Sequence, residues 1–317
     1  MSLAPIALFT YNRPRHTAQT VEALLANELA AQSDLYVFSD GAKSAEDAPQ
    51  VGAVRRYLDR LDGFRSITIT KRSRNMGLAE SIIAGVTEVC SLAGKIIVLE
   101  DDLLTSPHFL SFMNESLDLY ENDPEVIAIS SYVYPHRVHL PETFFIRGAD
   151  CWGWATWQRG WNMFNPDATS LFDELVSRDL TTEFDFRYYP YTRLLQMQIL
   201  GQIDSWAIRW YASAFLRDKL TLYPGTSLVQ NIGFDGSGTH SHSSSLLLGP
   251  TSDKRVTVRR LPFAEDGLAR REFERYFRRM RVRRLWAGAM AVLHHPRKAL
   301  GAVRRVARQV PSQSDDD

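Results

Sequence analysis

Residues 95–102 read Lys-Ile-Ile-Val-Leu-Glu-Asp-Asp, an apolar run followed directly by three carboxylates. The apolar stretch Ile96–Leu99 predicts a buried strand. Adjacent carboxylates repel one another unless a cation is near, and oxygen ligands of this kind select Mg²⁺ or Mn²⁺, often shared with substrate phosphates. The alternative is an acidic loop that caps the next helix, with Ser106 or Asp102 as the N-cap.

Strand and helix patterns alternate around this stretch. Short apolar runs predict strands, and apolar residues three and four apart predict the helices between them. The predicted strands are 5–10, 35–39, 66–71, 95–100 and 126–130, and the predicted helices are 14–29, 51–61, 79–92 and about 107–122. This alternation predicts an α/β fold with a doubly wound, mainly parallel sheet and helices on both faces.

Polar residues follow the carboxyl ends of the predicted strands, where ligands bind in such sheets. They are Thr10–Arg13, Asp40, Arg72–Asn75 and Glu100–Asp102. Their common position is the first indication of a binding site. The sequence contains neither GxGxxG nor GxxxxGKS/T, which argues against the dinucleotide and P-loop phosphate sites that need those glycines.

The composition changes after Asp150. Six of the seven tryptophans lie within residues 152–210, where helical patterns at about 191–200 and 206–216 precede a short strand pattern at 220–223. A glycine-rich loop, residues 231–240, then ends at His240.

The net charge of zero is the sum of an acidic and a basic part of the chain. Of 37 basic and 37 acidic residues, the segment 254–308 holds 17 Lys and Arg but only four acids. An acidic body is therefore followed by a basic segment. With 44% hydrophobic residues the chain is globular rather than disordered, and its longest wholly apolar run, 285–293, is too short to span a bilayer.

Five short motifs occur in order along the chain. They are 10–14 (Thr-Tyr-Asn-Arg-Pro), 40–41 (Asp-Gly), 74–78 (Arg-Asn-Met-Gly-Leu), 99–102 (Leu-Glu-Asp-Asp) and 153–157 (Gly-Trp-Ala-Thr-Trp). Together they resemble a GT-A-type glycosyltransferase of the family 2 kind over about residues 5–245. The Glu-Asp-Asp form of the metal motif is also similar to that of the eukaryotic enzyme that adds N-acetylglucosamine to start complex N-glycans.

The resemblance implies a GT-A-like catalytic domain over 1–250, with a nucleotide-binding half (1–130) and an acceptor-binding half (131–250). A basic, mostly helical C-terminal extension (251–317) follows. The implied activity is a metal-dependent, inverting transfer of a hexosyl or N-acetylhexosaminyl group, with Mn²⁺ or Mg²⁺ as cofactor. The donor would be a nucleotide-sugar, with a UDP-sugar favoured. The acceptor would be a glycan or a lipid-linked molecule in cell-surface polysaccharide or glycoconjugate synthesis.

The same resemblance implies roles for the residues that match the motifs. The nucleobase and ribose would be held by Thr10, Tyr11, Arg13 and Asp40. The loop that borders the nucleotide would include Arg74, Asn75 and Gly77. Asp102 would ligate the metal ion, while Glu100 and Asp101 would contact water, ribose or sugar. Each residue has an ordinary explanation when taken singly, such as a turn at Asp40-Gly41, so the assignment depends on their conjunction.

An inverting transfer needs a base to take the proton of the acceptor hydroxyl. Asp204 is the best candidate, because inverting GT-A enzymes use a carboxylate just before a helix in the second half of the domain. The alternative is that Asp204 caps the helix that begins near Trp206. Asp173 and Glu174 are weaker rivals for the base.

Three further residues complete the expected site. His240 would join the metal or pyrophosphate shell, and its loop would close over the donor. The alternative for His240 is a solvated loop position. Trp154 and Trp206 are expected to contact the acceptor, since sugar faces stack on aromatic rings, although tryptophans more often fill a core.

The basic extension carries apolar residues among its arginines. Within 268–295 they are Phe273, Tyr276, Phe277, Met280, Leu285 and Trp286, spaced for one side of a helix. One hypothesis is an interfacial helix in 268–308 that lies on an anionic membrane and brings the enzyme to a lipid-linked acceptor. The other is a helix packed on the catalytic domain with a solvated basic face. No nucleic-acid recognition motif accompanies the arginines, so a nucleic-acid partner is not expected.

Two other functions stay open. A sugar-phosphate nucleotidyltransferase would share a related fold, but residues 10–14 lack its glycine-rich basic signature. A catalytically inactive, membrane-associated glycan-binding or scaffold protein would bind no nucleotide with metal. Because the two cysteines, Cys90 and Cys151, form no disulfide framework and no secretory signal is recognisable, we expect a cytoplasmic protein or one peripheral on the cytoplasmic face of the membrane.

Overall fold

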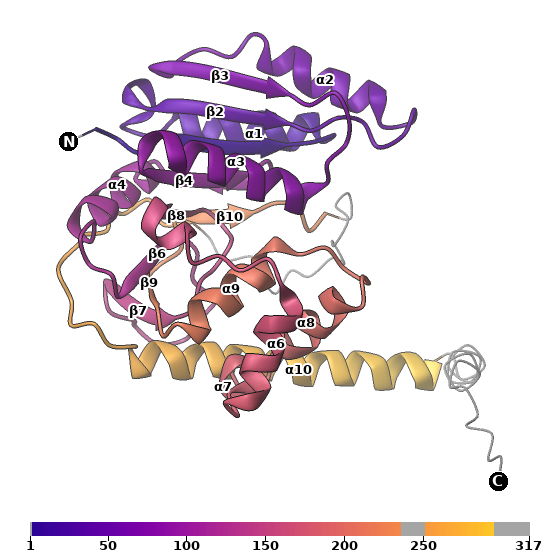
Figure 1. The fold of residues 1–317 in the computed structure, drawn as a ribbon, viewed down its shortest axis with the longest axis vertical. Helices are drawn as coiled ribbons and strands as arrows, with labels where there is room; N and C mark the ends of the chain where they lie inside the picture. The colour runs from indigo at the N-terminus through magenta and orange to yellow at the C-terminus, as the bar shows by residue number, and fades with distance from the viewer. Residues whose placement is uncertain (1, 236–250, 295–317) are drawn as a thin grey trace.

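The computed structural model describes residues 2–235 and 251–294, with side chains as far as Arg283 in the last helix. Its centre is an eight-stranded sheet in the order β3-β2-β1-β4-β8-β6-β9-β7 (Figure 1). The strands are β1 (Ile6–Thr10), β2 (Asp34–Ser39), β3 (Ser66–Lys71), β4 (Lys95–Glu100), β6 (Val126–Ser130), β7 (Thr143–Arg147), β8 (Trp154–Trp157) and β9 (Leu220–Pro224). A separate pair joins β5 (Leu103–Thr105) to β10 (Val229–Asn231).

Strands β1 to β4 run parallel, so their carboxyl ends lie at one edge of the sheet. β6 and β9 are also parallel, whereas β8 is antiparallel to both β4 and β6, and β7 is antiparallel to β9. The predicted mixed, mainly parallel α/β sheet is therefore confirmed. β8, which contains the Trp-Ala-Thr-Trp motif, joins the two halves of the sheet and has four buried residues.

Helices fill the connections between strands. They are α1 (Pro14–Leu25), α2 (Ala48–Leu58), α3 (Leu78–Ala93), α4 (Phe109–Leu119), α5 (Gln158–Trp161), α6 (Ala168–Ser177), α7 (Thr181–Phe184), α8 (Tyr191–Ile199), α9 (Trp206–Leu216) and α10 (Gly267–His294). Pro14 begins α1, where its missing N–H costs nothing. α1 ends at Leu25 instead of the predicted Leu29, because the Asn27 side chain binds Thr105 and the Leu110 N–H near the start of α4.

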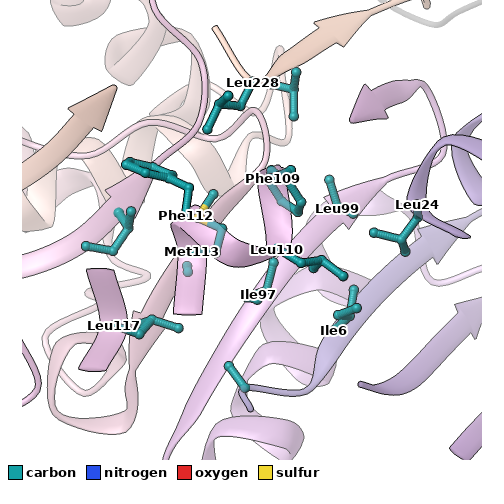
Figure 2. Packing of buried hydrophobic residues seen from close by; sticks show 14 of the residues in the cluster. Ile6, Leu24, Ile97, Leu99, Phe109, Leu110, Phe112, Met113, Leu117 and Leu228 are labelled. Carbon is teal, nitrogen blue, oxygen red and sulfur yellow. The ribbon is translucent and has the colours of Figure 1, made fainter. Parts of the chain in front are cut away.

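Alternate residues of the central strands enter cores on opposite faces of the sheet. Ile97 and Leu99 of β4 belong to one core, to which α4 contributes Phe109, Phe112 and Met113 (Figure 2). Ile96 and Val98 belong to the core on the other face, with residues of α3 and α9. Helices thus cover both faces, as the sequence predicted, and the strand-end residues are held on a rigid support.

The first part of α10 packs on the body of the protein. Phe273, Tyr276, Phe277 and Met280 are buried in a core shared with β7, β9 and helices α6 to α9. For these four residues the hypothesis of an apolar face lying on a membrane is wrong, because that face is covered by protein. The spacing of these residues along the helix is compatible with either a membrane surface or a protein core. The other two predicted residues of this face, Leu285 and Trp286, have side chains outside the described part.

Within residues 2–235 and 251–294, no helix combines the length and the apolar character needed to cross a bilayer.

Candidate active site

Neighbouring strands β1 and β4 bring a guanidinium and two carboxylates together. Phe9 pairs with Glu100, so the residues that follow the two strands lie beside each other. The Nη2 atom of Arg13 donates to Oδ1 of Asp101 and, at 3.0 Å, to Oδ2 of Asp102. Both aspartates are buried, and water therefore screens these ion pairs weakly.

The pKa values of the acids in this cluster are raised to different extents. Burial raises the pKa of Asp101 above its ordinary value, although Arg13 opposes the rise. Burial, together with the charges of Asp102 and Asp101, raises the pKa of Glu100 to about 8. A further positive charge at this edge would favour the ionised form of all three acids.

Asp102 is enclosed by a segment from far along the chain. Because β10 pairs with β5, Asn231 lies opposite Leu103, and the Ile232 N–H donates to the Asp102 carbonyl at 2.8 Å. Gly233 then lies against the carboxylate, so close that no side chain fits between them. The Oδ1 atom of Asp102 is buried and has no hydrogen-bond partner in the described part of the chain.

The oxygen donors at Asp102 suit a hard divalent cation. Oδ1 offers a buried lone pair, and carboxylate oxygen is a ligand that Mg²⁺ and Mn²⁺ prefer. Residues 2–235 and 251–294 contain no group of three His, Cys, Asp or Glu that could hold a metal ion. Mg²⁺ often takes one or two carboxylates and completes its shell with substrate phosphates and water, so Asp102 fits the metal role. His240, the other predicted ligand, lies outside the described residues.

Asp40 holds the loop between β3 and α3. Its Oδ1 accepts the N–H groups of Gly41 and Met76 at 2.8 and 2.9 Å. Its Oδ2 accepts the Gly77 N–H at 3.0 Å and the side-chain amide of Asn75 at 2.9 Å. Four donors use most of the accepting capacity of one carboxylate. Asp40 therefore positions the predicted nucleotide loop, and its own contact with the nucleotide stays a prediction.

The other predicted nucleotide residues lie at the same strand ends. The Thr10 hydroxyl is buried without a partner among the described residues. The Tyr11 hydroxyl accepts the Lys43 N–H at 3.0 Å and lies beyond the end of β2. Gly77 is the N-cap of α3 and has a φ of 79°, which favours glycine. Arg74 reaches into solvent, with 77% of its side chain exposed.

Asp204 is exposed in the turn before α9. Ser205 is the N-cap of this helix, because its hydroxyl accepts the Ile208 N–H at 3.3 Å. Asp204 instead accepts from the Arg209 guanidinium at 3.0 Å. The capping alternative for Asp204 is therefore wrong, and its role as the catalytic base stays a prediction.

The two tryptophans predicted to contact the acceptor are core residues. Trp154 and Trp206 are 1% and 3% exposed, and their stacked rings have centroids 5.3 Å apart. Trp161 and Trp210 also pack against Trp154. Acceptor contact through an open ring face is therefore wrong for both residues, since neighbouring rings cover them.

Two aromatic residues that were not predicted lie nearer to the carboxylates. Phe234 directly follows Gly233, the residue against Asp102, and its ring meets Trp152 with centroids 5.6 Å apart. Trp152 and Phe234 are both partly exposed. They are better placed than the buried tryptophans to stack on a sugar.

Asp150 is a titratable residue that sequence reasoning missed. It accepts the Cys151 N–H at 2.7 Å, and the hydroxyls of Tyr134 and Tyr223 lie near enough to lower its pKa. Burial raises the pKa of Asp150 to about 6. Burial and nearby charges, that of Asp102 among them, also raise the pKa of Cys151, which places this cluster beside the carboxylate site. No sequence motif indicates Asp150, because the residues around it come from segments that are distant in the sequence.

No family model matches the chain. Among solved structures, the chain is similar to the mannosyltransferase PcManGT from Pyrobaculum calidifontis in complex with GDP-Man and Mn²⁺. The identity is 14% and the TM-score 0.32, over 42% of this chain and 36% of that one. It is also similar to residues 1–349 of S. aureus TarS, with 8% identity and a TM-score of 0.38, over 71% of this chain and 59% of that one. The chain thus spans less than two thirds of either protein, and the likeness concerns parts of the fold.

Proposed function

We propose that this protein is a metal-dependent, inverting glycosyltransferase that moves a sugar from a nucleotide-sugar to a glycan or lipid-linked acceptor. The observation that carries the proposal is the cluster at the ends of β1 and β4. There Arg13 bridges Asp101 and Asp102, and the buried Oδ1 of Asp102 has no partner among the described residues. In a parallel sheet this edge is where a ligand binds.

The cluster suits a nucleoside diphosphate with a divalent cation. Asp102 would hold Mn²⁺ or Mg²⁺, which neutralises the negative charge of the departing diphosphate. Arg13 can offer charge-assisted hydrogen bonds to phosphate oxygens. The Arg74–Gly77 loop, fixed by Asp40, would border the nucleotide. A UDP-sugar is the favoured donor.

The proposed reaction is a direct displacement at the anomeric carbon. The acceptor oxygen forms the new bond to that carbon, while the bond from the carbon to the diphosphate oxygen breaks and its electrons leave with the diphosphate. The acceptor proton passes to Asp204, whose exposed carboxylate precedes α9. The transferred group would be a hexosyl or N-acetylhexosaminyl unit, and Trp152 and Phe234 are candidates for sugar contact.

Thermal melting with UDP, GDP, dTDP and CMP, each with and without Mn²⁺, tests the proposal. We expect one nucleotide to raise the melting temperature only with Mn²⁺. Asp102→Ala should abolish that rise, whereas Asp59→Ala, at an exposed acid beyond α2, should retain it. A lack of response to every nucleotide would instead favour a glycan-binding or scaffold protein. Formation of a nucleotide-sugar from a nucleoside triphosphate and a sugar phosphate would show a nucleotidyltransferase.

A further inference from the structure

The outer face of α10 carries arginines that the body of the protein does not neutralise. While the inner side of the helix enters the core, four exposed arginines form no ion pair with any described residue: Arg271, Arg278, Arg281 and Arg283. By contrast, Arg275 pairs with Glu272 on the same helix. Arg271, Arg278 and Arg281 are spaced for one side of the helix and form a basic strip there, whereas Arg283, two residues after Arg281, lies on nearly the opposite side.

The turn between α7 and α8 adds another arginine beside this strip. Phe186 and Arg187 have φ angles of 43° and 62°, which residues with side chains rarely adopt. The turn is held there because Phe186 is buried with the Arg270 guanidinium 3.8 Å from its ring centroid. Asp185 also accepts from the N–H and hydroxyl of Thr192. As a result, Arg187 is directed outward, with 66% of its side chain exposed.

A pocket of about 420 Å³ lies between this turn and α10. Its lining combines two guanidinium groups with apolar and aromatic surface: Arg187, Arg281, Tyr188, Tyr189, Phe277 and Met280. Arg187 lies 3.8 Å from Glu274, which is long for an ion pair, and the lining acid Asp185 is already bound to Thr192. Guanidinium groups recognise phosphate through paired N–H donors, so the pocket suits a phosphate group attached to a less polar moiety.

We propose that this pocket and the basic strip of α10 together dock the protein on an anionic phospholipid surface, with the pocket taking the phosphate of one lipid headgroup. The strip extends the positive charge beyond the pocket, to Arg278 and Arg271, as binding to a surface requires. α10 has 28 residues and is therefore about 42 Å long. It lies at the opposite end of the molecule from α2, as Figure 1 shows.

A second pocket provides a matched control for the charge. It has a volume of about 590 Å³, and its lining includes Arg56, Tyr57 and Arg60 of α2 and its end. Arg56 and Arg60 are exposed, as Arg187 and Arg281 are, but that pocket lies at α2, at the opposite end of the molecule from α10 (Figure 1). Removing two positive charges from this pocket changes the net charge as much as removing Arg187 and Arg281 does, but at the other end of the molecule.

The experiment measures sedimentation of the full chain with vesicles of phosphatidylcholine alone or mixed with equal parts of phosphatidylglycerol. We expect binding only to the anionic vesicles, weakened by salt. The R187Q/R281Q variant should bind about 25-fold more weakly, because each basic residue near such a surface contributes about fivefold. The R56Q/R60Q variant should bind as the natural chain does. Melting temperatures of both variants show whether each is folded.

Three results would overturn the proposal. The first is absence of binding to anionic vesicles by the natural chain, and the second is an equal loss in the two double variants. The third is that the pocket binds a soluble ligand instead of a lipid. In that case the binding of glycerol phosphate or of a single-stranded oligonucleotide would require Arg187 and Arg281, whereas the binding of vesicles would not. None of these measurements depends on transferase activity, so this proposal and the proposed function can fail separately.

Discussion

Gly233 lies against the carboxylate of Asp102, so that a Cβ atom at residue 233 would be 2.2 Å from Asp102 Oδ2 and 3.0 Å from Nη1 of Arg13. This close contact brings the residues that follow β10 against the acidic residues that follow β4. Oδ2 is occupied by Arg13 and Gly233, whereas Oδ1, which is also buried, has no partner among the described residues. The β10 end therefore helps to define which carboxylate oxygen can serve a ligand.

Gly233→Ala should disrupt the site more than the fold. The new methyl group must displace Asp102 or residues 231–235, and overpacking of this kind costs about 1–3 kcal/mol. We expect metal-dependent nucleotide affinity to fall by about tenfold or more, because 1.4 kcal/mol corresponds to tenfold. Calorimetric titration and thermal melting measure the two effects.

Gly52→Ala is the control for this substitution. Gly52 lies within α2, and the nearest atom to its Cβ would be the flexible end of Arg56 at 3.3 Å. Alanine in a helix is favoured over glycine by about 0.5–1 kcal/mol, so this variant should be at least as stable and bind nucleotide normally. Unchanged nucleotide affinity in Gly233→Ala would contradict the importance of the close approach.

Asp40→Asn should destabilise the loop that precedes α3. The amide that replaces Oδ1 or Oδ2 cannot accept from the N–H groups of Met76 or Gly77, and would face them with its own hydrogens. We expect a loss of about 3 kcal/mol in the free energy of unfolding, measured by urea denaturation. Asp59→Asn, at an exposed acid, should change it by less than about 0.5 kcal/mol. Equal effects of the two variants would show that Asp40 does not hold the loop.

The strands of the first half could be predicted because local patterns specify them. Predictions for β1 to β4 and β6 differ from the structure by one residue at most, since each is an apolar or alternating run. β5 and β10 have three residues each and depend on pairing across more than a hundred residues. No local pattern indicates such strands, so the enclosure of Asp102 by Gly233 could not be predicted.

The candidate site was predicted in part for the same reason. A parallel sheet places the ends of β1 and β4 together, which brings Arg13 to Asp101 and Asp102. The tryptophan assignments failed because composition does not reveal which ring faces are covered, as those of Trp154 and Trp206 are. Asp150 was missed because Tyr134 and Tyr223, which surround it, come from separate parts of the chain.

Asp150 should make stability depend on pH. Burial raises the pKa of Asp150 from 3.8 to about 6 in the folded protein, so folding favours its protonated form. This contribution is fully present below the unfolded pKa of 3.8 and is lost as the pH rises through about 6. Relative to the natural chain, Asp150→Asn should therefore gain on the order of 2 kcal/mol in the free energy of unfolding between about pH 4 and pH 8.

Urea denaturation of Asp150→Asn and the natural chain across this pH range measures the difference in their free energies of unfolding. Tyr223→Phe removes a hydroxyl that lowers the pKa of Asp150 and should move the dependence to higher pH. A stability difference between Asp150→Asn and the natural chain that is constant with pH would show that Asp150 does not change its protonation on folding.

Asp204→Asn should slow the transfer step without weakening donor binding. If the carboxylate of Asp204 takes the acceptor proton, the amide lacks the required basicity, and kcat should fall by about 10²–10⁴-fold. Glu174→Gln is a matched control, because Glu174 is also exposed and also pairs with an arginine, Arg178 at 2.9 Å. It was a rival candidate for the base, so unchanged kcat in this variant would exclude it. A fall in kcat for Glu174→Gln but not for Asp204→Asn would instead transfer the role to Glu174.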